Sequence, residues 1–329
     1  MYLKTFELFR EWLPVRFYRQ EDQALVDWCF VGKDRLTKPF FDESISQRFR
    51  KPFNLLFRHQ TPIGFLGELN EFSKGVKPTG FIFHLSRCGS TLVSQMLAAL
   101  ERNIVISEAS PIDAVLRAEN VPESERIRWL QWMINALGQK RNETEENLFI
   151  KFDSWNALEL DLIGRAFPDV PWIFLYRNPV EIIVSQMRQR GAYMIPGVIS
   201  DILPELSFEE SIRIPPEEFC ARILAKVCQN VIKPLQNGDG LAVNYAQLPA
   251  AVEETILKHF NFELSGNDLE IINAATKFNA KNPYLNFTGD TESKKKEASA
   301  AAIEAAEKLV NPIYKELEII RTSMQQTSL

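Results

Sequence analysis

The pattern of apolar and polar residues changes near residue 80 of the chain. Beyond that point, short apolar runs without polar alternation recur at 80–86, 103–107, 147–152, 171–177 and 240–245. Runs of this kind are typical of strands that are buried on both faces, as in a parallel sheet. Helical patterns separate them, so the order of elements predicts a parallel sheet between two layers of helices.

The segments between the predicted strands are expected to be helical. The pattern predicts helices at 90–100, 122–137, 154–167 and 179–190. The stretch 191–239 is expected to be partly helical, and we interpret 194–215 as an insertion that faces the substrate.

The first 78 residues have a different pattern. They are rich in aromatic residues, and their apolar and polar positions follow no long period. We interpret them as short helices and turns. The segment 72–80 contains two glycines and a proline, and we interpret it as the linker between these residues and the main domain. The predicted organisation is a small N-terminal accessory lobe over 1–78 and, over 79–329, a three-layer α/β sandwich with a central, mainly parallel sheet.

The charge balance and the cysteine content narrow the function classes. Thirty-eight Lys and Arg stand against 43 Asp and Glu, a net charge of −5, whereas a grip on nucleic acid needs a broad basic face. The four cysteines and three histidines show no metal-ligand spacing, and no disulfide framework is expected. The charged residues among the first twenty positions and the lack of a long uncharged apolar window mean that neither a signal peptide nor a transmembrane helix is expected. We expect a cytoplasmic protein with neither a nucleic-acid nor a membrane partner and without a metal; its oligomeric state, a homo-oligomer included, is left open.

The first candidate site follows the first predicted strand, because ligands of open parallel sheets bind beyond the carboxyl ends of the strands. The turn consists of Ser86, Arg87, Cys88, Gly89, Ser90 and Thr91. A turn from a strand into a helix gathers backbone N–H groups and the positive end of the helix, which suits an anion. The plain alternative is that Ser90 only caps the helix and that Arg87 is a surface charge. The turn is not a Walker A loop, since it has one glycine and no lysine.

The second candidate site follows the fourth predicted strand. Arg177 ends this strand, and Ser185 lies eight residues later, on the second turn of the next helix. From the strand end and the helix, these two side chains could converge on a second phosphate. The alternative is an ordinary Arg at a strand end and a buried helical Ser.

The two sites together resemble the sulfotransferase family. The resemblance rests on SRCGSTL at 86–92 and LYRNPVEIIVSQ at 175–186, and it covers about 80–300. Members of this family have a P-loop NTPase-like fold and transfer a sulfuryl group from 3′-phosphoadenosine 5′-phosphosulfate (PAPS). The resemblance implies that the first turn holds the 5′-phosphosulfate and that Arg177 and Ser185 bind the 3′-phosphate. Arg87, where many members have Lys, favours the branch similar to bacterial and tyrosylprotein sulfotransferases.

Weaker similarities follow in the same order along the chain. Tyr245 ends a late strand at a position where the family's Tyr approaches the nucleotide. Phe287, Asp290 and the lysines Lys294, Lys295 and Lys296 resemble a C-terminal flap that closes over it. The sequence departs here from the Gly-rich pattern of the cytosolic enzymes, so which Lys reaches the nucleotide is left open, and a solvated run of lysines is the alternative. Cys88 stands where Ser is common in the family, and it is expected to be a small residue that the turn tolerates.

Sulfuryl transfer also needs a base near the acceptor. The resemblance implies Glu108 as a carboxylate base, whereas Asp153 falls where the cytosolic enzymes have a His; we favour Glu108. Lys151 occupies the position of the Lys that contacts the bridging oxygen, and Arg87 is expected to stabilise the departing phosphate. His84 is expected to be a core or supporting residue. The alternatives are a Glu108 that only favours the following helix and a Lys151 that reaches solvent.

The sequence therefore predicts a sulfotransferase that uses PAPS and acts on a hydroxyl, or an amine, of a small molecule or a peptide. One alternative is a P-loop phosphotransferase that uses ATP and Mg²⁺, although the turn lacks the Walker Lys. The other is a non-catalytic module that binds 3′-phosphoadenosine 5′-phosphate (PAP) or a protein. The acceptor pocket is expected from the loops 109–125 and 191–215 and from the N-terminal lobe.

Overall fold

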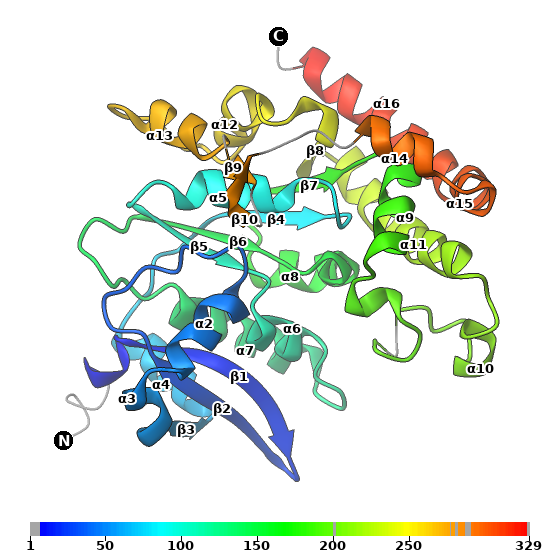
Figure 1. Cartoon of the computed structure of the whole chain (residues 1–329). Helices are drawn as coiled ribbons and strands as arrows, with labels where there is room; N and C mark the ends of the chain where they lie inside the picture. Colours follow the sequence, from blue (N-terminus) through cyan, green and yellow to red (C-terminus); the bar gives the residue numbers. More distant parts are fainter. Residues whose placement is uncertain (1–6, 200–201, 277, 280–281, 287–290, 328–329) are drawn as a thin grey trace.

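A five-stranded sheet forms the centre of the molecule (Figure 1). The computed structural model describes residues 7–199, 202–276, 278–279, 282–286 and 291–327. In spatial order, the strands are β5 (Asn103–Ser107), β6 (Asn147–Lys151), β4 (Pro78–His84), β7 (Trp172–Tyr176) and β8 (Gly240–Asn244). All neighbouring pairs are parallel. The five predicted strands are confirmed, with ends that differ by two residues at most.

Both faces of this sheet are buried. Successive side chains of a strand point to opposite faces, so Phe81 and Phe83 of β4 join one apolar core, and Ile82 joins the other. The core around Ile82 lies under α5 (Ser90–Ala98), η4 (Val252–Ile256), α12 (Leu257–His259) and α13 (Asp268–Ala275). Burial on both sides explains why the strands read as continuous apolar runs.

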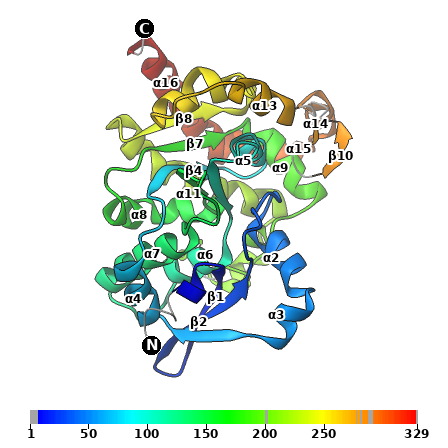
Figure 2. The same cartoon turned by 90° about the vertical axis from the view of Figure 1, so that its left-hand side faces the viewer.

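Helices from the middle and the end of the chain cover the opposite face (Figure 2). They are α6 (Ser110–Leu116), α7 (Glu123–Leu137), η1 (Ser154–Glu159), α8 (Leu160–Ala166), α9 (Pro179–Arg188), α11 (Pro216–Gln236), α15 (Ala300–Ala305), η5 (Ala306–Val310) and α16 (Asn311–Thr327). The other elements that follow β4 in the chain are η2 (Ala192–Met194), α10 (Phe208–Ser211), η3 (Tyr245–Gln247), β9 (Phe278–Asn279), β10 (Asn282–Asn286) and α14 (Thr291–Glu297). Helices on both faces of a parallel sheet confirm the predicted three-layer α/β fold.

The N-terminal segment contains a second sheet, and the prediction of only short helices and turns there is wrong. Its strands β1 (Trp12–Gln20), β2 (Gln23–Phe30) and β3 (His59–Pro62) are antiparallel and lie beside α2 (Phe41–Phe49), α3 (Pro52–Leu56) and α4 (Gly64–Phe72). The hairpin between β1 and β2 turns at Glu21, which has a φ of 53°. This turn lacks the Asn or Gly that usually marks a hairpin, so it could not be recognised from the sequence.

The N-terminal segment shares its apolar core with the main sheet. The rings of Phe17 on β1 and Trp129 on α7 lie 5.6 Å apart, and one cluster of buried residues runs from Phe9 to Ile320. The segment forms the lower part of the molecule in Figures 1 and 2, below the central sheet. The division of the chain into an accessory lobe over 1–78 and a main domain over 79–329 stays a prediction. Among the described residues, no helix is long and apolar enough to span a membrane.

Candidate active site

A cavity of about 390 Å³ lies at the edge of the sheet where the carboxyl ends of β4, β5 and β6 meet. Its lining comes from the turn after β4, from the ends of the neighbouring strands, from the N-terminal segment and from the chain that follows α9. The lining residues are Phe40, Glu43, His84, Ser86, Arg87, Ser90, Thr91, Glu108, Asp153, Ser154, Trp155, Gln189, Gly191, Ala192 and Tyr193. Seven of the predicted site residues therefore line one cavity or, like Lys151, lie directly behind it.

The turn after β4 has the backbone of an anion-binding turn. Gly89 has a φ of +87°, and a Cβ at this position would lie 2.7 Å from Leu248 Cδ1 and 3.0 Å from Tyr245 Cδ2. Only glycine combines this conformation with such a close approach. Ser90 then begins α5, and both Ser90 and Thr91 line the cavity. The N-terminal end of α5, whose first backbone N–H groups have no partner within the helix, therefore lies beside the cavity.

Contacts with α9 fix this turn. Gln186 donates from Nε2 to Ser86 Oγ at 3.0 Å, and Arg87 donates from Nη2 to the carbonyl of Gln189 at 2.8 Å. Cys88 points the other way and is fully buried, and its Sγ donates to the Leu175 carbonyl at 3.1 Å. Burial raises the pKa of the Cys88 thiol to about 12, which leaves it unreactive. Cys88 is thus a structural residue of the turn and does not contact the cavity.

The second predicted site adjoins the first. The Arg177 guanidinium lies 3.9 Å from the centre of the Tyr245 ring, and its Nη1 lies 3.5 Å from the carbonyl oxygen of Arg87. Its Nε donates to Glu181 at 2.6 Å, and both side chains of this ion pair are buried. Tyr245 packs against Gly89, so these side chains form one group with the turn. The sequence analysis missed Glu181, although its position four residues after Arg177 is a standard ion-pair spacing.

The remaining residues of the predicted nucleotide site that the structure describes lie on or beside α9. Ser185 is half-buried on the second turn of α9. Lys294 is buried on α14, which packs against α9 and is held there by Arg188, Ser293 and Glu297. The structure therefore places Lys294 on the side of the molecule that also carries Ser185. Phe287, Asp290 and the side chain of Lys295 lie outside the described residues.

Three titratable side chains meet behind the turn. Glu108 Oε1 lies 2.8 Å from Lys151 Nζ and 3.4 Å from His84 Nε2. Burial alone would raise the pKa of Glu108, but the charge of Lys151 and the contact with His84 outweigh it and lower the pKa to about 2. Burial lowers the pKa of the His84 imidazole, so His84 is neutral near pH 7. His84 was expected to be a core or supporting residue, and it contacts the predicted base.

Asp153 lies in the same cavity, and its pKa is shifted in the opposite direction to that of Glu108. It precedes η1, and its backbone N–H donates to Asn156 Oδ1 at 3.1 Å. Burial, followed by the negative charges of Glu108 and Asp113, raises the pKa of Asp153 well above its usual range. One cavity therefore holds a strongly ionised carboxylate and one that retains its proton to a higher pH, an arrangement typical of acid–base sites.

The structure does not fit the alternative interpretations of Lys151, as a side chain that reaches solvent, and of Glu108, as a residue that only favours the following helix. Lys151 is fully buried, with its ammonium 4.8 Å from the centre of the Phe40 ring, so it does not reach solvent. Glu108 has a φ of 53° and precedes α6 by two residues, so its side chain does not serve the first turn of that helix. Phe40 and Glu43 could not be predicted as lining residues, because nothing in the first 78 residues indicated that α2 would reach the sheet edge.

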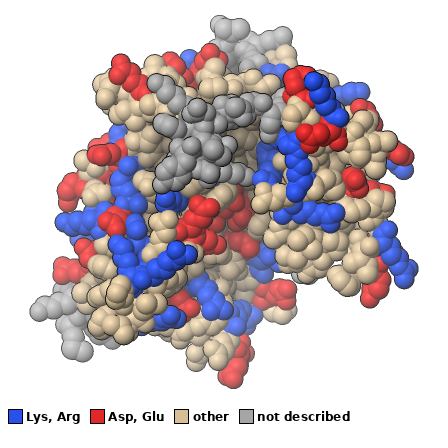
Figure 3. Space-filling model, in the orientation of Figure 1, with Lys and Arg blue, Asp and Glu red and all other residues tan. Residues whose placement is uncertain are grey.

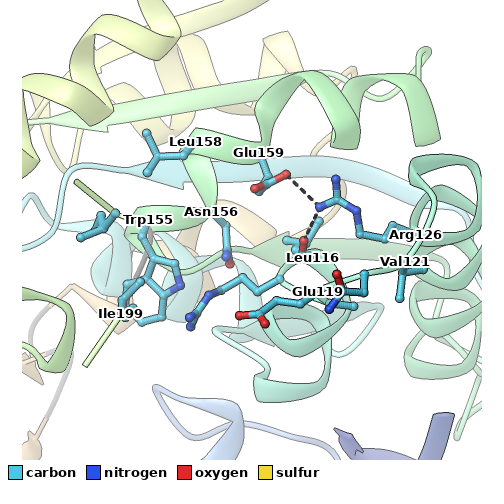
Figure 4. Close-up of a pocket in the computed structure, with 13 residues that line it drawn as sticks. Leu116, Glu119, Val121, Arg126, Trp155, Asn156, Leu158, Glu159 and Ile199 are labelled. Atoms are coloured by element: carbon cyan, nitrogen blue, oxygen red, sulfur yellow. Dashed lines mark hydrogen bonds and ion pairs between the residues drawn. The ribbon is translucent and has the colours of Figure 1, made fainter. Parts of the chain in front are cut away.

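A second cavity, of about 300 Å³, lies beyond Trp155, which lines both (Figure 4). Its walls are residues 116–121 with Arg126, the segment 155–159, and Ile199 with Ile202. Arg126 lies 3.6 Å from Glu159 and donates to the Leu116 carbonyl at 2.7 Å. The predicted acceptor loops 109–125 and 191–215 both contribute to this cavity.

On the face shown in Figure 3, acidic side chains gather at the centre, between two groups of basic side chains. Within the described part of the chain, no group of three or more His, Cys, Asp or Glu is arranged to hold a metal ion. The expectation that no metal is needed stays a prediction.

Comparisons with known proteins give structural similarities only. No family model and no curated protein matches the sequence. The sulfotransferase domain of the curacin biosynthetic pathway is 15% identical, with a TM-score of 0.43, over 76% of this chain and 98% of that domain. The sulfotransferase domain of the Synechococcus PCC 7002 olefin synthase is 16% identical, with a TM-score of 0.40, over 71% and 95%. Retinol dehydratase in complex with androsterone and the inactive cofactor PAP is 13% identical, with a TM-score of 0.33, over 80% and 86%. Two of these three solved structures are sulfotransferase domains, and the two sequence motifs resemble the same family.

Proposed function

We propose that the protein is a PAPS-dependent sulfotransferase. The observation that carries this proposal is the cavity itself, in which the N-terminal end of α5 and Arg87 lie beside Lys151, Glu108 and Asp153. An anion-binding helix end next to a buried Lys and two carboxylates of different pKa suits transfer of an anionic group to an acceptor whose proton must be removed.

The donor would bind across the turn. Ser86, Arg87, Ser90 and Thr91 would supply donors for the 5′-phosphosulfate, and Gly89 lets the turn pack closely against Leu248 and Tyr245. PAPS supplies a sulfuryl group on a phosphate leaving group. Arg87 and Lys151 are placed to stabilise the charge that develops on that phosphate. Arg177 and Ser185 would bind the 3′-phosphate, Tyr245 would approach the nucleotide, and Lys294 of α14 would close over it.

The two carboxylates suit different tasks. Glu108, the base favoured by the sequence, is ion-paired with Lys151, and a pKa of about 2 makes it a weak proton acceptor. Asp153 is better matched to a base near neutral pH, because its pKa is raised. We therefore assign proton removal to Asp153 and the positioning of Lys151 to Glu108.

The acceptor would approach through the second cavity. Its lining combines apolar side chains, among them Ile199 and Ile202, with the ion pair of Arg126 and Glu159. Such a lining suits a hydroxyl- or amine-bearing small molecule or peptide residue with both apolar and polar groups. Trp155 would lie between the body of the acceptor and the reacting atoms.

Nucleotide binding separates the candidate functions. Thermal unfolding with PAP, AMP and ATP–Mg is expected to show stabilisation by PAP, about 2.7 kcal/mol at 100 times its Kd. Arg177→Ala is expected to weaken PAP binding with little change for AMP, and equal losses for both nucleotides would remove the 3′-phosphate role. Stabilisation by ATP–Mg alone would favour a phosphotransferase. PAP binding without sulfation of any acceptor would favour a non-catalytic module.

Turnover separates the two carboxylates. Asp153→Asn is expected to lower kcat by about 10²-fold or more with unchanged PAP affinity, because it removes a proton acceptor. Glu108→Gln is expected to weaken PAP binding as well, because it releases Lys151. A Glu108→Gln enzyme that loses only kcat, together with an active Asp153→Asn enzyme, would restore Glu108 as the base.

A further inference from the structure

Helix α3 and the residue after it expose apolar side chains and bury a polar one. The exposed fractions are 44% for Phe53, 54% for Leu55, 77% for Leu56 and 54% for Phe57, whereas Asn54 is only 2% exposed. This distribution is the reverse of that in an ordinary surface helix, which buries its apolar face.

The surrounding structure holds this arrangement in place. Asn54 donates from Nδ2 to the carbonyls of Phe30 and Arg48, at 2.9 and 3.1 Å, and its Oδ1 accepts from the Phe30 N–H at 2.9 Å. The Phe53 ring lies 4.8 Å from the Phe30 ring and 4.9 Å from the Phe57 ring. The buried amide thus anchors α3 to β2 and directs Leu55 and Leu56 outward.

An apolar patch of this kind needs an explanation. Leu and Phe side chains left in water forgo the favourable free energy of burial. Four such side chains within five positions (53–57) form a contiguous patch, and contiguous apolar patches mark interaction surfaces, whereas single exposed apolar residues do not.

The residues around the patch are basic. Arg50, Lys51 and Arg58 are exposed on either side of it, and residues 44–67 contain no Asp or Glu, in a chain with a net charge of −5. Lys51 and Arg48 share one nearby carboxylate, that of Asp34, at 3.2 and 3.5 Å. In Figure 3, the lower-left part of the molecule, where Figure 1 places α3, shows an uncharged area with Lys and Arg above it.

We propose that residues 52–57, here called the α3 patch, dock the protein on an anionic lipid bilayer. Leu and Phe side chains would enter the boundary between headgroups and acyl chains, and the flanking Lys and Arg would face lipid phosphates. This peripheral contact differs from a membrane span and revises the expectation that the protein has no membrane partner.

The charges favour lipid over a second copy of the chain. A symmetric dimer through the α3 patch would bring Arg50 and Arg58 of one copy against the same residues of the other. Like charges at such short range oppose association, whereas anionic headgroups neutralise them.

Docking through the α3 patch would bring the cavity close to the bilayer. Helix α2 leads from the cavity, where Phe40 and Glu43 lie, toward α3. Its nine residues span about 13 Å at 1.5 Å per residue. An acceptor group carried by a lipid or a membrane-bound molecule would then lie within reach of the site.

Vesicle co-sedimentation tests the proposal directly. The protein is expected to bind vesicles of phosphatidylcholine and phosphatidylglycerol in a 3:1 ratio, and to bind pure phosphatidylcholine vesicles at least tenfold more weakly. The double variant Leu56→Ser/Phe57→Ser should reduce binding to the anionic vesicles at least tenfold, and so should Arg50→Gln/Arg58→Gln. The matched control is Ile319→Ser, an exposed apolar residue of α16 (70% exposed), which should bind like the wild type.

Two measurements keep the result interpretable. Thermal unfolding and PAP binding should be the same for all variants, because the substituted side chains are exposed and outside the cavity. The proposal is overturned if the wild type does not bind anionic vesicles or if the α3 patch variants bind as well as the wild type. It is also overturned if light scattering shows a dimer that Leu56→Ser/Phe57→Ser dissociates, since the patch would then join two copies.

Discussion

Folding shifts the proton affinities of two neighbouring carboxylates, Glu108 and Asp153, in opposite directions. The pKa of Glu108 is lowered to about 2, so its pairing with Lys151 contributes stability above the unfolded value near 4.5, and this contribution is lost as the pH falls toward 2. The pKa of Asp153 is raised, so ionisation of Asp153 destabilises the folded protein. This loss of stability begins as the pH rises above the pKa of the unfolded chain, near 3.8, and is complete above the pKa of the folded protein. The site therefore holds one carboxylate that stabilises the fold at neutral pH and one that destabilises it.

Asp153→Asn is accordingly expected to stabilise the protein. Asn has nearly the same shape and also precedes helices well, so the start of η1 is retained. The gain is expected at pH 7.5 and should shrink as the pH falls toward 4. Thermal unfolding at a series of pH values measures it, with Glu108→Gln, expected to destabilise at pH 7.5, as the comparison. An equal gain at pH 4 and pH 7.5 would contradict the assigned titration.

Gly89→Ala is expected to disrupt the turn after β4. The positive φ and the contact with Leu248 and Tyr245 should together cost about 2–4 kcal/mol, and PAP binding should be lost. Gly164→Ala is the matched control, because Gly164 lies in α8 with no neighbouring atom within 4 Å of the new Cβ. The control should gain about 0.5–1 kcal/mol. Normal PAP binding by Gly89→Ala would mean that the close approach at this position has no role in ligand binding.

At the scale of elements, η1 separates the two cavities and depends on one carboxylate. Asp113 Oδ1 accepts from Trp155 Nε1 at 2.6 Å and from the buried Asn156 Nδ2 at 2.8 Å. These two bonds join η1 to α6 and fix the ring of Trp155. The shape of the proposed acceptor cavity thus depends on a residue that lines neither cavity.

Asp113→Ala is expected to raise the KM for the acceptor and to leave PAP affinity unchanged. Loss of the acceptor atom leaves the Asn156 amide buried without this partner, which should cost about 1–3 kcal/mol. Asp113→Asn keeps one oxygen and should retain most of both properties. Steady-state kinetics and thermal unfolding of the two variants measure the effect. A rise in the Kd for PAP that exceeds the rise in acceptor KM would place the defect on the donor side.

The sequence predicted the elements of the main sheet well, because strands buried on both faces leave continuous apolar runs. It failed for the β1–β2 hairpin, whose turn at Glu21 has no glycine and whose register shifts between Pro14 and Arg16. Motifs within the chain indicated Arg87, Gly89 and the other residues of the turn. The contacts of Lys151 with Glu108 and Phe40 could not be predicted, because they join segments far apart in the chain.

At the scale of the whole molecule, the N-terminal segment is part of the core. Phe17 packs on Trp129, and α4 packs on α7, so removal of residues 7–72 would uncover apolar side chains of the main domain. The segment also supplies Phe40 and Glu43 to the cavity. Stability and the site therefore depend on the same stretch of chain.

A fragment that begins at residue 74 is expected not to fold into a cooperative unit. The exposed surface of α7 should lead to aggregation or to dye binding typical of a loosely packed state, and PAP binding should be absent. Circular dichroism and thermal unfolding of the fragment and the full chain measure this. A fragment with a sharp unfolding transition and normal PAP affinity would show that the first 73 residues are dispensable.

The position of β4 at the middle of the sheet has a consequence during synthesis. Its pairing partners come late, since Phe81 pairs with Ile150 on one side and with Trp172 on the other. At 5–20 residues per second, a ribosome makes these partners roughly 3–18 s after β4. For that time a run of bulky apolar side chains has no neighbouring strand, so a nascent chain of this protein is a natural client for a chaperone that shields extended apolar segments.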